Sequence, residues 1–349
     1  MSHDAITIAG AGLSGLAAAL TLANAGREVV VHEKGAVCGA QRHNDVEGLE
    51  TWIFPQDPLD YLQSQGLPTS FDHHPARTFH FIDHRGQVHS TTAQRPYFYL
   101  LRRGAEPGSL DRTFQLAAEA AGVQLRFGSK RSAAEVAIFA GGPRRAKAYV
   151  EGLTFSTPAP DGVYLLLGGT VAPAGYAYCI IWSGRGTIAS AYRVGASSSG
   201  DVLSEAVTRF RDVLGLSMED PVKFGSFGSY APRPTSMESG ALLVGEAAGF
   251  QDALFGFGMN YAIRSGVLAA RALIHGDQYA ALARKELVGR MASSWVNRGW
   301  YERLGAAPRS LLAARLMSSG TAWAVLHRVS RPSLGKRLIS GWSHLRGRR

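Results

Sequence analysis

The stretch Ala5–Glu33 restricts the possible folds more than any other part of the chain. It reads as a short apolar strand, a glycine turn, an Ala- and Leu-rich helix and a second, β-branched strand. The turn has the spacing G-x-G-x-x-G, formed by Gly10, Gly12 and Gly15. A strand, glycine turn, helix and strand in this order predict the opening unit of a doubly wound α/β sheet.

Each glycine has a physical role in such a turn. Gly10 permits the tight bend, Gly12 lets the backbone approach a pyrophosphate, and Gly15 lets helix and strand pack closely. The first helical residues, Leu13 and Ser14, then present free N–H groups and the positive end of the helix dipole to a phosphate. The turn is therefore predicted to bind a phosphorylated ligand.

A carboxylate follows at the distance that a dinucleotide site requires. Glu33 stands eighteen residues after Gly15 and can accept hydrogen bonds from a ribose hydroxyl. Lys34 adjoins it. These residues predict a dinucleotide site without choosing between NAD and FAD, and a chance glycine-rich turn is the alternative.

Length and composition exclude several other classes of protein. The 349 residues are enough for about two domains. The composition, with 46% hydrophobic and 18% charged residues, indicates a globular chain. The only cysteines, Cys38 and Cys179, leave no disulfide framework and suit a reducing cytoplasm. No signal peptide precedes the first strand, and the only run long enough to mimic a membrane span, Ala5–Leu22, is broken by its glycines. The histidines between His73 and His89 lack metal-ligand spacing, so we expect a cytoplasmic protein without a metal site.

The net charge of +10 is concentrated near the C-terminus. From Ala281 to Arg349 there are twelve Arg and two Lys against two Glu, so the rest of the chain is close to −2. The composition predicts helices in which Leu and Trp alternate with Arg. A basic amphipathic region of this kind suits an anionic membrane surface. Packing of these helices on the body, with the arginines in solvent, is the somewhat favoured alternative, whereas nucleic-acid binding is disfavoured because no recognised module is present.

Two further patterns follow the opening unit. Short β-rich runs between Leu153 and Val194 have hairpin spacing and few charges, and predict an antiparallel sheet inserted into the first domain. A second strand–glycine loop–helix unit then spans Ala241–His275, with Glu246 at the end of its strand.

Together, the two glycine units resemble the FAD-dependent oxidoreductases of the hydroxybenzoate-hydroxylase fold group, in the geranylgeranyl reductase-like branch. The matching segments are GAGLSGLAAALTLANAGREVVVHEK and LLVGEAAGFQDALFGFGMNYAIRSGVLAA. In the second segment Gly256 and Gly258 match the family pattern, whereas Glu246 replaces its usual Asp and Ala253 stands near its usual Pro. The resemblance implies FAD as the cofactor and covers residues 1 to about 275.

The resemblance also implies further cofactor contacts. Glu246 is expected to bond the ribityl hydroxyls. The helix start at Gly258, Met259 and Asn260 is expected to offer N–H groups to the flavin ring, where they would stabilise negative charge. Of the Arg102–Arg103 pair, which precedes a Leu-Asp as in the family, we choose Arg102 as a flavin neighbour. Arg42 is expected to contact either FAD phosphate or substrate.

The catalytic residues are inferred from weaker matches. Tyr176 and Tyr178 lie in a segment that resembles the reductases' substrate segment, and Trp52, Phe255 and Phe257 are further candidates for an apolar substrate cavity. Cys38 is a candidate proton donor near the flavin, although a small buried thiol would also pack as a hydrophobe.

The predicted fold is α/β, with a Rossmann-like FAD-binding domain, an inserted antiparallel β-sheet substrate domain and a helical C-terminal region. The predicted boundaries are 1–70, 101–152 and 236–276 for the FAD-binding domain, 71–100 and 153–235 for the substrate domain, and 277–349 for the basic region. The implied activity is double-bond reduction of an isoprenoid-like or aromatic substrate, with hydroxylation or a non-catalytic flavin-binding role as alternatives. Because a second G-x-G-x-x-G is missing, the reductant is expected to be a transiently bound NAD(P)H or a redox protein.

Overall fold

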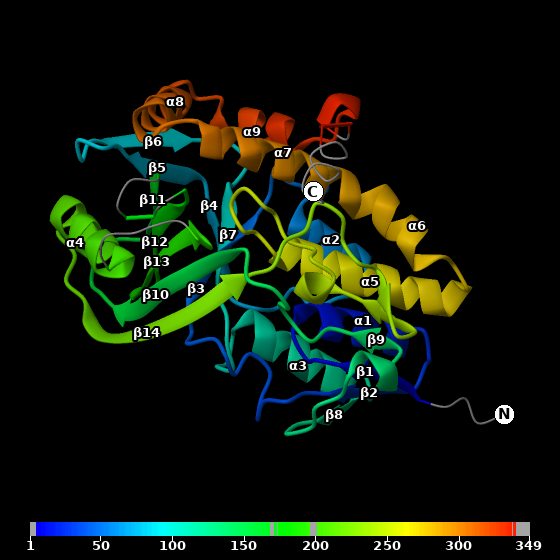
Figure 1. Ribbon diagram of the computed structural model, residues 1–349. Helices are drawn as coiled ribbons and strands as arrows, with labels where there is room; N and C mark the ends of the chain where they lie inside the picture. The colour runs from blue at the N-terminus through cyan, green and yellow to red at the C-terminus, as the bar shows by residue number, and fades with distance from the viewer. Residues whose placement is uncertain (1–4, 168–170, 173, 196–200, 337, 340–349) are drawn as a thin grey trace.

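The computed structural model describes residues 5–167, 171–172, 174–195, 201–336 and 338–339. Two large sheets lie side by side, and C-terminal helices run across the top of both (Figure 1). A small third sheet joins them. Residues 340–349 of the predicted basic region lie outside the described part of the chain.

The first sheet is the predicted Rossmann-like core. Its strands are, in spatial order, β15 (Met237–Glu238), β16 (Ala241–Leu243), β9 (Ile138–Phe139), β1 (Ile6–Ala9), β2 (Val29–His32) and β8 (Gln124–Arg126). All neighbours except β15 and β16 are parallel. The helices packed here are α1 (Leu13–Asn24), α3 (Leu110–Ala120) and α5 (Met259–His275), with α1 in contact with both others. The strand–turn–helix–strand prediction and the predicted start and end of α5 are confirmed.

The second sheet is the predicted β-rich insertion. Its order is β14 (Glu219–Gly228), β10 (Ala148–Ser156), β13 (Arg185–Arg193), β12 (Tyr176–Trp182), β11 (Gly162–Leu167), β5 (Thr78–Ile82) and β6 (Val88–Thr92). Only the β11–β5 pair is parallel. Helix α4 (Val202–Leu214) covers one face over a separate core cluster, which leaves the other face turned toward the Rossmann-like unit.

The third sheet contains β3 (Val46–Glu50), β7 (Phe98–Arg102) and β4 (His73–Ala76), all antiparallel. It divides the segment 71–100, which we expected to belong to the substrate sheet alone. Strands β5 and β6 form an antiparallel hairpin in the second sheet, whereas β4 and most of β7 pair in the third. Helix α2 (Pro58–Ser64) follows β3, with its N-terminus capped by Asp57.

The C-terminal region is helical, as predicted. It contains α6 (Tyr279–Ala283), a π-helical turn (Arg284–Val288), α7 (Gly289–Arg303), α8 (Ala306–Ser318) and α9 (Ala322–Ser330). Helix α8 packs over β5, β6 and β11, and α9 packs against α7 (Figure 1). Short 3-10 turns occur at Ala133–Glu135 and Gly245–Ala247. Within the described ranges, no helix combines the length and apolar character needed to cross a bilayer.

Candidate active site

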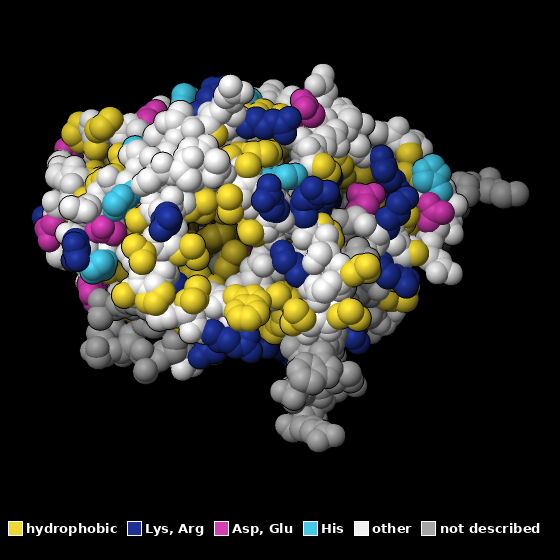
Figure 2. All heavy atoms as spheres, turned by 90° about the horizontal axis from the view of Figure 1, so that it is seen from above, with side chains coloured by type: hydrophobic (Ala, Val, Ile, Leu, Met, Phe, Trp, Pro, Cys, Tyr) yellow, Lys and Arg dark blue, Asp and Glu magenta, His cyan; other side chains and the backbone are white. Residues whose placement is uncertain are grey.

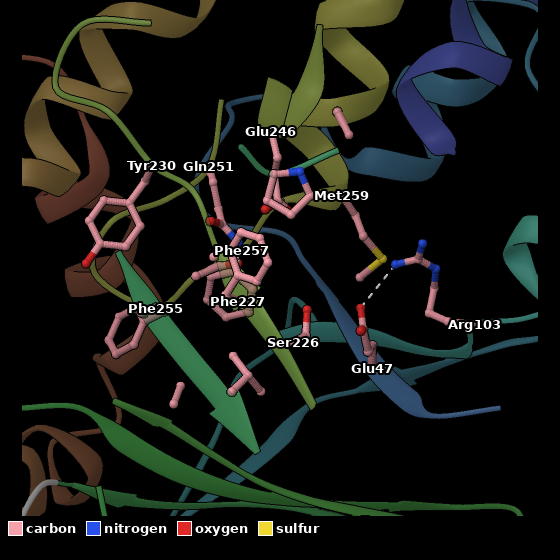
Figure 3. Close-up of a pocket in the computed structure, with 18 of the residues that line it drawn as sticks. Glu47, Arg103, Ser226, Phe227, Tyr230, Glu246, Gln251, Phe255, Phe257 and Met259 are labelled. Atoms are coloured by element: carbon pink, nitrogen blue, oxygen red, sulfur yellow. Dashed lines mark hydrogen bonds and ion pairs between the residues drawn. The ribbon is translucent and has the colours of Figure 1, made fainter. Parts of the chain in front are cut away.

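A cavity of about 1080 Å³ extends from the first glycine turn to the C-terminal helices. One end is lined by the two strand–glycine–helix units. The other is lined by the open face of the second sheet and by α7, α8 and α9. Figure 3 shows its middle, where the Glu47–Arg103 ion pair lies beside Met259 and the rings of Phe227, Phe255 and Phe257 lie on the other side.

The first glycine turn is shaped as the sequence predicts. Gly10 has φ +98°, and a Cβ built on Gly15 would lie 1.9 Å from the carbonyl oxygen of Gly10. A Cβ on Gly12, in contrast, would meet nothing within 4 Å. The first and last glycines therefore close the turn, whereas Gly12 faces open cavity.

The start of α1 is open to this cavity. Its N-cap is Gly12, no side chain caps it, and Leu13 and Ser14 line the cavity. The unpaired N–H groups and the helix dipole make this a place where an anion would be stabilised.

Glu33 holds the turn against the next loop. Its Oε2 accepts a hydrogen bond from Ala11 N at 2.8 Å, and its Oε1 accepts one from Gly35 N at 2.7 Å. The side chain lines the cavity, as does exposed Lys34. A carboxylate held at this point can receive a ribose hydroxyl that approaches along the turn.

The second glycine unit reaches the same cavity from the other side. Helix α5 begins after Gly258 without a side-chain cap, and Gly256, Gly258 and Met259 line the cavity. Two helix N-termini from segments more than two hundred residues apart therefore open into one space. An elongated ligand with an anionic centre would contact both.

Glu246 also lines the cavity at this second unit. Its Oε2 accepts a hydrogen bond from Ser229 N at 3.4 Å. Burial raises the pKa of Glu246 to about 7. Near neutral pH this carboxyl group can therefore accept a hydrogen bond or donate one to a ligand hydroxyl.

A network of charged side chains forms part of the cavity wall. The Arg103 guanidinium donates from Nε and Nη2 to the two Asp111 oxygens at 2.8 and 2.9 Å, and its Nη1 lies 3.3 Å from Glu47. Arg42 Nη1 donates to the other Glu47 oxygen at 2.6 Å and lies 3.4 Å from Asp45. Each arginine thus shares Glu47, and the network fixes the wall from which Arg42, Glu47 and Arg103 face the cavity.

The pKa values in this network follow from burial and pairing. Glu47 raises the pKa of Arg42. Burial alone would raise the pKa of Glu47 and Asp111, but the neighbouring arginines lower both below their ordinary values. Burial raises the pKa of Asp45 to about 7. The network therefore keeps Glu47 and Asp111 ionised at neutral pH.

The structure corrects the choice of Arg102. This residue does not line the cavity and pairs with Asp72, with Nη2 2.6 Å from Oδ2, on the outer side of β7. The adjacent Arg103 takes the inward position. The two arginines differ because successive residues at a strand end point to opposite sides.

The far end of the cavity is apolar and aromatic, as predicted. The predicted lining residues present there are Trp52, Tyr176, Tyr178, Phe255 and Phe257. The Tyr176 hydroxyl donates to the Phe255 carbonyl oxygen, which ties β12 to the second glycine loop. The described residues offer the Tyr178 hydroxyl no hydrogen-bond partner, and burial raises the pKa of Tyr178 well above its ordinary value. Tyr178 is therefore a protonated hydroxyl that faces the cavity.

Two predicted site residues lie behind the wall instead. Cys38 is 1% exposed and packs in the core, and burial raises the pKa of its thiol to about 12. It does not line the cavity, so the interpretation as a packed thiol holds and the proton-donor expectation is corrected. The side chain of Asn260 is also buried away from the cavity, where its Nδ2 donates to Glu50 O at 2.9 Å and Glu50 Oε1 at 3.0 Å, so any contact of Asn260 with the ligand would be through its backbone N–H, as expected from the sequence.

Sequence reasoning missed several residues of the site. Those with polar groups at the cavity wall include Glu47, Gln251, Tyr230 and Arg298. The sequence did hold a usable signal for Glu47: three carboxylates, Asp45, Glu47 and Glu50, lie in or next to the short strand Val46–Glu50, and buried carboxylates require partners. For the cavity-lining residues of α7, α8 and α9, the sequence shows only an amphipathic pattern, which does not indicate that they line a cavity. Within the described part of the chain, no group of three or more His, Cys, Asp or Glu side chains is placed to hold a metal.

Comparisons with known proteins agree with this architecture. Residues 8–84 match a family model described as an NAD(P)-binding Rossmann-like domain. A search of curated proteins found no relative by sequence.

Solved structures match almost the whole chain. A geranylgeranyl bacteriochlorophyll reductase-like protein from Thermoplasma acidophilum has a TM-score of 0.69 at 17% identity, over 96% of this chain and 95% of its own. The p-nitrophenol 4-monooxygenase of Pseudomonas putida has a TM-score of 0.66 at 15% identity, over 93% and 96%. A flavin-dependent brominase has 0.65 at 13% identity, over 93% and 92%. The chain has the fold of this group, which confirms the fold resemblance that its two glycine units indicate.

Proposed function

We propose that this chain is an FAD-dependent oxidoreductase that acts on a small apolar substrate. The observation that carries the proposal is the single cavity into which α1 and α5 both open, with an apolar far end. A nucleotide with a central pyrophosphate and a reactive ring at one end suits this arrangement of two anion-stabilising helix starts and an aromatic chamber.

The residues present fit such a cofactor. The open space at Gly12 and the start of α1 would receive the pyrophosphate, and Glu33 would receive the adenosine ribose. Glu246 and the start of α5 would hold the ribityl and ring end. When bound, FAD supplies the redox chemistry, and the protein supplies position and electrostatics.

Double-bond reduction is the reaction we favour, with hydroxylation as the alternative. Reduction of an alkene needs a proton as well as a hydride, and Tyr178 offers a protonated hydroxyl to the apolar chamber. Tyr176 does not compete for this role, because its hydroxyl is engaged with Phe255. Electrons would come from a transiently bound NAD(P)H or from a redox protein.

One variant tests the cofactor proposal directly. The purified chain should carry bound FAD, seen in its absorption spectrum and after denaturation. Gly12→Ala should fold normally, because Gly12 has φ −78° and room for a methyl group, yet bind FAD about tenfold or more weakly because the methyl occupies ligand space. A chain without flavin that also fails to bind added FAD would contradict the proposal. Two assays of the FAD-loaded chain with NAD(P)H then distinguish the reactions. Oxygen consumption in air that depends on substrate would indicate hydroxylation, whereas saturation of an alkene without oxygen would indicate reduction.

A flavin-binding protein without turnover is the second candidate. It is favoured by the placement of two predicted catalytic residues, since Cys38 is buried in the core and Tyr176 is hydrogen-bonded to the backbone. To test this candidate, the FAD-loaded chain is mixed with a series of apolar alkenes and arenes and with NAD(P)H or a reduced protein donor. If the donor is oxidised slowly or not at all with every compound, the non-catalytic role is favoured.

A further inference from the structure

The face formed by the C-terminal helices carries an unusual share of exposed apolar side chains. Seven of the thirteen large hydrophobic side chains that are exposed within the described residues fall between positions 300 and 339. They are Trp300, Leu304, Leu311, Leu312, Leu334, Leu338 and Ile339. Concentrated exposure of this kind marks an interaction surface.

Three of these side chains also line the cavity. Trp300 and Leu312 are each 61% exposed, Leu304 is 38% exposed, and all three belong to the cavity wall. A side chain that meets both solvent and cavity lies at an opening, so these three define the mouth of the apolar end. Figure 2 looks onto this side of the molecule and shows a hollow lined by hydrophobic side chains, with Lys and Arg side chains around it.

The charge around the mouth is predominantly positive. The described residues 303–336 contain five Arg and one Lys and no Asp or Glu, and the adjacent Glu302 is paired with Arg298 and Arg193. Arg303 lies 5.8 Å from the centre of the Trp300 ring, and Arg309 lies 4.7 Å from that of Tyr301 and lines the cavity. Arg315 is exposed on the same helix as Leu311. Leucine and tryptophan side chains set among arginines are the residues that hold a helix at an anionic lipid surface.

We propose that this face, defined by Trp300, Leu304, Leu311, Leu312 and the arginines beside them, docks onto an anionic lipid bilayer. The mouth of the cavity then opens into the lipid. A second copy of the chain is a poorer partner, because it would place two predominantly cationic surfaces against each other. Entry of an apolar substrate from the bilayer rests on the proposed function, whereas the docking itself does not.

Sedimentation of the full chain with lipid vesicles tests this proposal. Vesicles of phosphatidylcholine with phosphatidylglycerol should bind the protein more tightly than phosphatidylcholine alone, and salt should weaken the binding. Leu311→Gln should weaken it about tenfold through lost apolar burial, and Arg315→Gln about fivefold through lost charge. Neither residue is buried, so both variants should keep the wild-type melting temperature.

Matched controls lie on the opposite side of the molecule. Leu116 is 47% exposed on α3 and Arg126 is exposed on β8, both far from α8 in Figure 1. Leu116→Gln and Arg126→Gln should bind vesicles as the wild type does. Absence of vesicle binding by the folded protein, equal loss in the controls, or a dimer in solution that Leu311→Gln disrupts would each overturn the docking proposal. Flavin content measured on the same samples reports separately on the proposed function, since vesicle binding requires no flavin.

Discussion

Two neighbouring arginines at the end of β7 have opposite surroundings, and this predicts opposite consequences of losing them. Arg103 is 6% exposed and binds both oxygens of buried Asp111. Arg103→Gln should lower the free energy of unfolding by about 3–5 kcal/mol, because it leaves a carboxylate buried without its partner. Arg102→Gln should cost less than about 1 kcal/mol, because its ion pair with Asp72 is open to solvent. Urea unfolding of both variants measures this, and equal losses would show that the network is not structural.

Glu50 predicts a pH dependence of stability. It is 1% exposed, its Oε2 has no hydrogen-bond partner, and burial raises its pKa from 4.5 to about 8. As pH rises through this interval the unfolded chain loses the proton while the folded protein retains it, so stability falls by up to about 1.4 kcal/mol per pH unit.

Glu50→Gln keeps an acceptor for Asn260 and removes the titration. The variant should therefore gain stability relative to the wild type between about pH 5 and about pH 8, measured by urea unfolding. Glu28→Gln, at an exposed position, should track the wild type throughout. Parallel wild-type and Glu50→Gln curves over this range would contradict the assignment of a buried, protonated Glu50.

Residues such as these mark the limit of what the sequence can predict. Strand alternation shows that one arginine of the pair 102–103 faces inward. Which one depends on the buried face of β7, and that face is set by its partners β3 and β4, whose paired residues lie 22 to 56 positions earlier in the chain. Cys38 was harder still to place, because it lies in a turn rather than a strand; its neighbours Val37 and Gly39 line the cavity and it does not.

At the scale of elements, the contact between α1 and α5 places the two helix starts. A Cβ built on Gly266 would lie 2.1 Å from the carbonyl oxygen of Ser14, so the two helices can approach only at glycine. Gly266→Ala should lower the free energy of unfolding by about 1–3 kcal/mol and weaken FAD binding, because both proposed anion sites shift. Gly299→Ala in α7 is the matched control, since its Cβ would be 3.7 Å from the flexible Arg303 side chain. It should be neutral or stabilising by up to about 1 kcal/mol. Thermal unfolding and flavin titration of the two variants check this, and similar behaviour would contradict it.

The elements themselves were largely predictable, because their signals are local. Helix α5 occupies Met259–His275 as predicted, since an uncapped glycine precedes it and Gly276 ends it with φ +73°. The β5–β6 hairpin was readable from its Asp83–Gly86 turn. The parallel pairing of β5 with β11 was not, because it joins segments about eighty residues apart and no local pattern records it.

At the scale of the whole molecule, the C-terminal region is part of the site. The sequence left open whether this region packs on the body or contacts a membrane. In the structure it lines the cavity through α7, α8 and α9, while its outer face exposes leucines and arginines. One amphipathic pattern produces both results, because the helices have one face toward the body and one away from it. Composition alone could not separate these roles.

The join between this region and the second glycine loop gives the last prediction. Ser294 in α7 is 4% exposed, and its Oγ accepts hydrogen bonds from Ala253 N at 2.6 Å and Leu254 N at 3.0 Å. Ser294→Ala leaves two N–H groups without this acceptor and should lower the free energy of unfolding by about 1–3 kcal/mol. It should also speed the release of FAD, because the loop that leads into α5 loses its anchor. Ser318→Ala removes an exposed hydroxyl whose only partner among the described residues is Ala314 O, and should change neither quantity. If Ser294→Ala released FAD at the wild-type rate, the C-terminal helices would cover the cavity without organising the loop that leads into α5.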